Sequence, residues 1–105
     1  MSEFNAKVKK HGISFGETDD NILFWMELEL PHCVAVYFVI KASTAEGNSN
    51  FAHSIGEVMK ILEVKRLEEI DGRPLIAIFD GEMSIGSKLI GIKHFLDKDS
   101  FMLEQ

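Results

Sequence analysis

The clearest pattern in the chain is an alternation of apolar and polar positions from residue 22 to residue 30. Every second residue there is apolar: Ile22, Phe24, Met26, Leu28 and Leu30. The residues between them, which include Trp25 and Glu27, would lie on the opposite face, because successive side chains of a strand point to opposite sides. The pattern predicts a strand with its apolar face on the core, and Pro31 and His32 would end it.

The segments on either side of this strand differ in character. Val34–Lys41 (VAVYFVIK) is β-branched, aromatic and almost wholly apolar, which is typical of a central strand covered on both faces. Val8–Phe15 mixes apolar residues with a basic run, Lys7 and Lys9 to His11, and contains Gly12 as a breaker. It predicts a short, bulged strand at the edge of a sheet, where lysines also discourage pairing between molecules.

A helical spacing begins after the small polar residues 42–50, which predict a loop. Apolar residues then fall on one side of a helix of about three turns. They are Phe51, Ile55, Val58, Met59 and Leu62. Leu67–Ile70 is expected to add one further turn.

The last third of the chain returns to strands. Leu75–Phe79 and Ser87–Phe95 predict two strands, joined through Asp80–Gly86. The tail, Leu96–Gln105, is expected to pack on the body. The predicted order is β-β-β-α-β-β, which fits the α+β class as a mainly antiparallel sheet with one helix on a face.

Length and composition favour a single folded domain over residues 1–105. Of these 105 residues 46% are hydrophobic and 27% charged, and 8 glycines and 2 prolines are too few for a disordered or Pro-rich chain. The longest apolar stretch, Cys33–Ile40, is shorter than the roughly 20 residues of a membrane span. Residues 1–10 lack a signal-peptide core. We therefore expect a cytoplasmic protein.

The charge balance bears on the class of partner. Eleven basic residues against seventeen acidic ones give a net charge of −6. A field of that sign repels nucleic-acid phosphates and anionic lipids, and it steers the protein toward basic surfaces. We expect no direct nucleic-acid binding, no membrane contact, and a protein partner with a basic surface.

Three segments of the second half carry a resemblance. They are Glu57–Glu63 (EVMKILE), Leu67–Pro74 (LEEIDGRP) and Ile90–Phe101 (IGIKHFLDKDSF). The stretch over about residues 51–101 resembles a family of small phage and prophage proteins. The shared features are an apolar helix, a short turn with acidic residues, a strand that starts at Gly-Arg-Pro, and the closing segment. The resemblance implies a phage accessory role with a host or phage protein as partner. It implies no reaction, because the family has no assigned catalytic residues.

Residues in a pattern typical of metal binding or catalysis are scarce. The four histidines fall on different predicted elements, and the one close pair of ligand type, His53 and Glu57, is too small for a metal site. Cys33, the single cysteine, is expected to be a buried structural residue. We predict no enzyme activity, no metal and no cofactor. The alternative is a small enzyme that uses a buried carboxylate or His94.

The candidates for partner binding are one aromatic and five acidic residues: Trp25, Glu68, Glu69, Asp71, Asp80 and Glu82. Trp25, on the outward side of its strand, would either anchor a partner or be covered by the tail at residues 101–103. The acidic residues would steer a basic partner toward the protein. They would provide solubility alone or, if they share one face, imitate the phosphates of DNA.

These observations predict a non-enzymatic, phage-derived accessory protein that acts by binding another protein. A more specific form of this hypothesis is that the protein inhibits a host defence system, as an anti-CRISPR protein does. A third hypothesis is a homo-oligomeric structural protein that pairs through the expected edge strand, Val8–Phe15.

Overall fold

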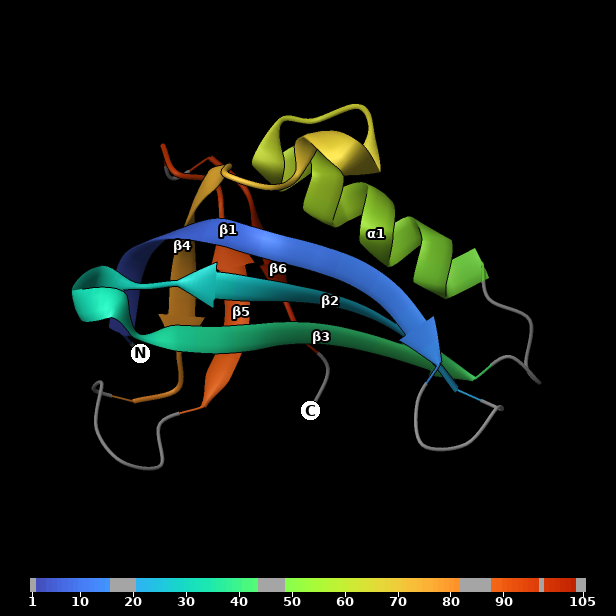
Figure 1. Cartoon of the computed structure of the whole chain (residues 1–105), viewed down its shortest axis with the longest axis horizontal. Helices are drawn as coiled ribbons and strands as arrows, with labels where there is room; N and C mark the ends of the chain where they lie inside the picture. Colours follow the sequence, from blue (N-terminus) through green and yellow to red (C-terminus); the bar gives the residue numbers. More distant parts are fainter. Residues whose placement is uncertain (1, 16–20, 44–48, 82–87, 97, 104–105) are drawn as a thin grey trace.

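The computed structural model describes residues 2–15, 21–43, 49–81, 88–96 and 98–103 (Figure 1). These residues form six strands and one α-helix: β1 (Ser2–Phe15), β2 (Asn21–Glu29), β3 (Ala35–Ser43), α1 (Ser49–Leu62), β4 (Pro74–Phe79), β5 (Leu89–Lys93) and β6 (Ser100–Met102). All neighbouring strands pair antiparallel in one sheet. The predicted α+β class and order of elements are confirmed, and the tail adds the short strand β6.

The long strand β1 joins the two halves of the sheet, whose strand order is β3-β2-β1-β4-β5-β6. Residues 2–7 of β1 pair with β4, whereas residues 7–15 pair with β2. A β-bulge between Val8 and Lys10 marks the change of partner, and a bulge bends a strand and increases its twist. Figure 1 accordingly shows β1, β2 and β3 running across β4, β5 and β6.

The inner face of this bent sheet holds the hydrophobic core. Phe24, Met26 and Leu28, which the alternation placed on one face of β2, have no exposed surface. Phe38 of β3 is equally buried, and the centroid of its ring lies 6.0 Å from that of Phe101 on β6. The two edge strands therefore meet across the core.

Helix α1 spans Ser49–Leu62, as the apolar spacing predicted, and its apolar stripe joins the same core. The expected further turn is present as a short 3₁₀ helix, Leu67–Glu69. Among the described residues, no helix combines the length and the apolar composition that a membrane crossing requires.

The expected position of β3 is wrong. This strand lies at the edge of the sheet, and its outward residues Tyr37 and Val39 are exposed. A continuous apolar run lacks the alternation that would show which face is covered, so the sequence did not distinguish a central strand from an edge strand.

The expected edge strand, residues 8–15, is the second half of β1. It contains the predicted bulge, and among the described strands its neighbour is β2. Its other side faces the turn before β4, where the N–H of Val8 donates to the carbonyl of Arg73 at 2.9 Å. Among the described strands, residues 8–15 thus form an edge as expected, and the nine residues of β3 form a second, longer edge.

Candidate functional site

The outer face of β1, β2 and β3 carries an aromatic pair. Trp25 of β2 and Tyr37 of β3 contact edge to face, with ring centroids 6.3 Å apart. The indole ring lies against Gly12, its register partner on β1, where an added Cβ would be only 2.6 Å from the Cζ2 atom of Trp25. Any larger residue at position 12 would displace the ring, since backbone and ring approach closely there. Gly12 therefore makes room for the aromatic pair.

Glu27 connects this pair to the lysines of β1. Its side chain is only 10% exposed, and its carboxylate accepts a hydrogen bond from the Tyr37 hydroxyl at 3.3 Å. The Nζ atoms of Lys9 and Lys10 lie 3.7 and 3.5 Å from the same carboxylate. Both lysines can reach it because a β-bulge sets two residues opposite one. A buried carboxylate is costly without such partners, because it has lost its contacts with water. Its hydrogen bond with Tyr37 also holds that side chain in place.

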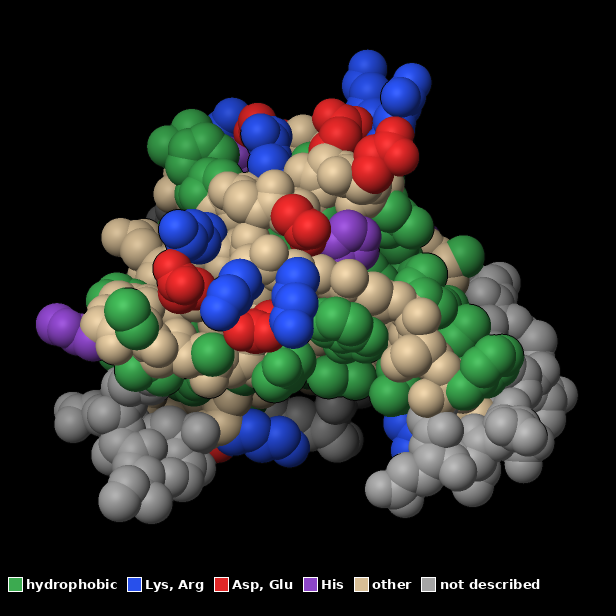
Figure 2. All heavy atoms as spheres, in the orientation of Figure 1, with side chains coloured by type: hydrophobic (Ala, Val, Ile, Leu, Met, Phe, Trp, Pro, Cys, Tyr) green, Lys and Arg blue, Asp and Glu red, His purple; other side chains and the backbone are tan. Residues whose placement is uncertain are grey.

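Part of this outer face is apolar and open to solvent. Figure 2 shows hydrophobic side chains over β2 and β3, beside interleaved basic and acidic side chains over β1 and β2. Tyr37 is 58% exposed and Val39 39%, whereas Trp25 is half-buried. The described residues of the tail do not cover Trp25, because Phe101 and Leu103 pack against the core on the inner side.

Three of the candidate acidic residues lie on the turn between α1 and β4: Glu68, Glu69 and Asp71. All three are exposed, and we call residues 68–71 the acidic turn. The carboxylate of Asp71 lies 2.7 Å from Nδ1 of His11 on β1, and the N–H of Gly72 donates to the carbonyl of Val8 at 2.6 Å. These contacts fix the acidic turn to β1 through His11, whose ring centroid lies 6.5 Å from that of the buried Phe24.

The other two candidate acids do not join this group. Asp80 follows the far end of β4, which is six residues or about 20 Å long, and its carboxylate accepts a hydrogen bond from the backbone N–H of Lys88 at 2.9 Å. Glu82 lies outside the described residues. Phosphate mimicry by the whole set would require a common face, and Asp80 is separated from the acidic turn by the length of a strand.

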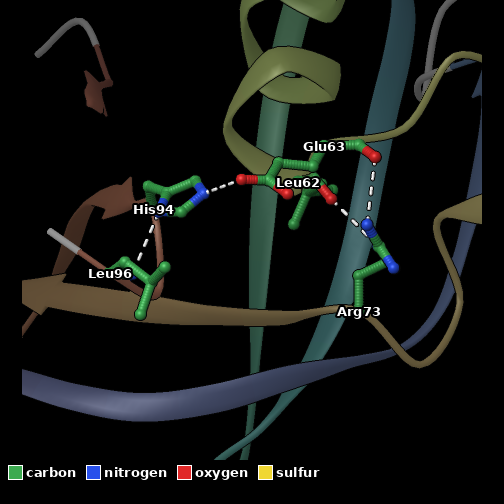
Figure 3. Close-up of polar contacts among 5 residues, drawn as sticks. All are labelled: Leu62, Glu63, Arg73, His94 and Leu96. Carbon is green, nitrogen blue, oxygen red and sulfur yellow. Dashed lines mark hydrogen bonds and ion pairs between the residues drawn. The ribbon is translucent and has the colours of Figure 1, made fainter. Parts of the chain in front are cut away.

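His94, the residue of the enzyme alternative, is buried and has a partner at each ring nitrogen (Figure 3). The backbone N–H of Leu96 donates to Nδ1 at 3.0 Å, which leaves the ring proton on Nε2. That nitrogen donates to the carboxylate of Glu63. The ring also stacks on Phe95, with centroids 4.7 Å apart. With both nitrogens engaged, His94 has none available for a substrate.

Glu63 occupies a position at the end of α1 that normally favours glycine. Its φ is +56°, and backbone hydrogen bonds from Glu63 and Val64 to the last turn complete a Schellman ending. Arg73 caps the same end, with Nε donating to the Leu62 carbonyl at 2.9 Å and a terminal guanidinium nitrogen to the Glu63 carbonyl at 3.0 Å. A carboxylate at a helix C-terminus is opposed by the helix dipole. The hydrogen bond from His94 offsets this unfavourable interaction of the Glu63 carboxylate with the helix dipole.

The hydrogen bond from His94 is the largest cause that lowers the pKa of the Glu63 carboxyl below its ordinary value of 4.5, and the charges of Lys98 and Arg73 add to it. Glu63 follows α1 and His94 follows β5, so the pair ties the helix end to the second half of the sheet. We assign the pair a structural role.

Two further expectations concern Cys33 and metal binding. Cys33 is exposed, so its expected burial is wrong. It lies with His32 in the turn between β2 and β3, where both have positive φ, and that tight reversal turns the side chain away from the core. On α1, Nε2 of His53 lies 3.9 Å from a carboxylate oxygen of Glu57. No three His, Cys, Asp or Glu side chains come together as metal ligands within the described parts of the chain.

An apolar hollow of about 370 Å³, which the sequence did not indicate, lies at the end of β2. Its lining is formed by Phe4, Leu30, Pro31, His32 and Val34. The lining contains neither a carboxylate nor His94. It therefore does not supply the cleft that the enzyme alternative requires.

Sequence reasoning found Trp25 but missed the residues that hold it. The alternation places Glu27 on the same side as Trp25, and this was the available signal for a shared face. Gly12 and Tyr37 join them only through the strand register, which sets Gly12 opposite Trp25 and Tyr37 opposite Glu27.

Comparisons of the chain with models of protein families, with curated proteins and with solved structures found no match. The function is therefore argued from the geometry of the outer face.

Proposed function

We propose that this chain is a non-enzymatic protein that acts by binding another protein through the outer face of β2 and β3. The observation that carries the proposal is the state of Tyr37, which is 58% exposed yet held by Trp25 and Glu27. An aromatic side chain that is fixed before binding loses little conformational entropy on contact. Such residues are common energetic anchors of interfaces.

The acidic turn supports a partner with a basic surface. The Glu68 side chain is 73% exposed and that of Asp71 53% exposed, so both charges are accessible to a partner. Glu68 is paired with the exposed Arg66, and Asp71 with His11. The lysines of β1 are paired within the sheet, Lys7 with Glu29 and Lys9 and Lys10 with Glu27. Rim charges of this kind mainly accelerate encounter, whereas a central aromatic anchor lengthens residence.

The resemblance of residues 51–101 supplies the biological setting of the proposal. On this basis the chain is a phage or prophage accessory protein, and its partner is a host or phage protein that it occludes. Inhibition of a host defence system, as anti-CRISPR proteins do, is the specific form. The net charge of −6 argues against nucleic acid as the direct partner.

The enzyme alternative is favoured by a single observation, the burial of His94 beside Glu63. Proton transfer to a substrate needs a ring nitrogen within hydrogen-bond reach of it. Both nitrogens of His94 are already bonded within the protein, so this alternative takes second place.

Capture from a bacterial host lysate by the immobilised chain tests the proposal. We expect Tyr37→Ala to lower capture of the bound protein by about tenfold or more, as the loss of an interface anchor does. Met102→Ala, which trims an apolar side chain on β6 that is 45% exposed, is the control and should capture as the wild type does. Equal capture by all three proteins would remove the outer face as the binding surface.

A salt series separates the two parts of the proposed surface. Capture should weaken as ionic strength rises from about 0.05 to about 0.5 M, because salt screens exposed charges. The double substitution Glu68→Lys with Glu69→Lys should reduce capture most at low salt. Capture that is indifferent both to salt and to this charge reversal would contradict a basic partner while leaving the role of Tyr37 open to its own test.

A further inference from the structure

Strand β3 forms a long, regular edge of the sheet. It pairs with β2 over all nine of its residues without a register shift. In an antiparallel pair every second residue of an edge strand points its N–H and C=O away from its neighbour. Figure 1 shows β3 along the lower border of the layer formed by β1, β2 and β3. This edge therefore presents a row of backbone donors and acceptors.

The features that normally prevent edge pairing are present elsewhere in the sheet and missing from β3. The opposite edge, β6, has only three residues. The second half of β1 carries a bulge and lysines. In contrast, the described residues of β3 include no proline and no bulge, and their first charge is Lys41. Long apolar edges without these features are templates for pairing with another strand.

We propose that two copies of this chain pair antiparallel through β3, so that two six-stranded sheets become one continuous sheet across a twofold axis. The inference goes beyond the proposed function, because it concerns a second copy and not the captured partner. A C₂ contact uses the same patch on both molecules and therefore requires a strand that complements itself.

The sequence of β3 meets this requirement when the twofold axis passes at Phe38. Tyr37 then lies directly opposite Val39 of the second copy on the outer face, and Val36 lies opposite Ile40 on the inner face. Aromatic and β-branched residues are favourable cross-strand pairs. Tyr37 and Val39 are exposed by 58% and 39%, so the pairing would bury apolar surface that is open in the single chain.

Charge also favours a second copy at this edge. In the same register Lys41 lies opposite Ala35, so no like charges face each other across the axis. On the neighbouring strand, Glu27 and Glu29 are paired with lysines of β1. The exposed acidic turn is attached to β1, two strands away from the edge. Strand β3 itself, where the two copies would meet, contains no acidic residue.

Sedimentation equilibrium of the full chain over a roughly hundredfold dilution series tests the proposal, because mass action shifts a dimer toward monomer on dilution. We expect twice the mass of one chain at high concentration. The double substitution Tyr37→Lys with Val39→Lys sets lysines opposite lysines across the axis and should halve the mass. Met102→Lys places one lysine on the other edge strand, at a side chain that is 45% exposed, and should leave the dimer intact.

Several outcomes would overturn the proposal. A wild-type chain that is a monomer at every concentration would do so, and so would a dimer that survives the β3 substitutions. Hydrogen exchange of the wild type gives a second readout that does not depend on the variants folding. Amides of β3 should exchange more slowly at high than at low concentration, while those of β6 should not change. Slowing confined to other strands would assign the contact elsewhere, and slowing of β3 only with lysate protein present would assign the edge to a different partner.

Discussion

The two faces of β2 and β3 are built from alternate residues of the same strands, yet they differ in what covers them. On the inner face Phe24 and Phe38 have no exposed surface. On the outer face Trp25 is half-buried and Tyr37 is largely exposed. Both faces of β2 and β3 therefore carry large apolar side chains, but only the inner face forms the hydrophobic core. The inner face accounts for folding, and the outer face is free to serve contacts with other molecules.

The largest effect that this comparison predicts is a difference between two neighbouring residues of β3. Phe38→Ala should lower the free energy of unfolding by about 3–5 kcal/mol, because it removes a fully buried ring and leaves a cavity beside Phe101. Val39→Ala, at the next and 39% exposed position, should cost less than about 1 kcal/mol. Urea unfolding followed by circular dichroism measures both. Similar losses at the two positions would mean that the outer face is also part of the stable core.

A medium effect is expected where the outer face is closely packed. Gly12→Ala puts a Cβ 2.6 Å from the Cζ2 atom of Trp25, so the ring must move, and such overpacking costs about 1–3 kcal/mol. The fluorescence emission of Trp25, the single tryptophan, should shift to longer wavelength as the ring becomes more exposed. Ser14→Ala, two residues further along β1, is the control and should change neither property. Unchanged emission in the Gly12 variant would show that the ring does not depend on the glycine.

The smallest effect is expected at Glu63, whose exposed carboxylate meets the buried His94. Because the contact lowers the pKa of this carboxyl, its contribution to stability is complete above the ordinary pKa of 4.5 and is lost as pH falls through the lowered value. Glu63→Gln keeps the shape but cannot ionise. The variant should therefore be less stable than the wild type at pH 6, and the gap should close in acid. Urea midpoints measured from pH 6 to pH 3 check this, and a gap that stays constant would contradict it. Solvent screening of the exposed carboxylate keeps the effect small.

Much of the fold was predictable because its signals are local. The alternation of β2 identified the buried residues Phe24, Met26 and Leu28, and the helical spacing identified α1 to within a few residues. The sheet position of β3 was not predictable. An edge strand and a doubly covered strand can have the same apolar sequence, and the difference lies in what packs beside them.

The candidate site was predictable only in part. Trp25 stood out as a large aromatic residue on the polar side of an alternating strand. Its support by Gly12 and Tyr37 depends on contacts between residues 13 and 12 positions apart in sequence, which strand register brings together. Likewise, nothing near His94 in the sequence indicates Glu63, which lies 31 residues earlier.

The amino-acid order alone determined which segments become strands or helix and which face of β2 and of α1 leaves water, because periodicity acts over a few neighbouring residues. Tertiary structure alone decided that β3 lies at the edge of the sheet and that the Trp25 ring lies against Gly12. It also decided that Asp80 lies far from the acidic turn. These outcomes depend on how strands line up and bend across the whole sheet, and at β1 a single bulge redirects the strand from one partner to the other.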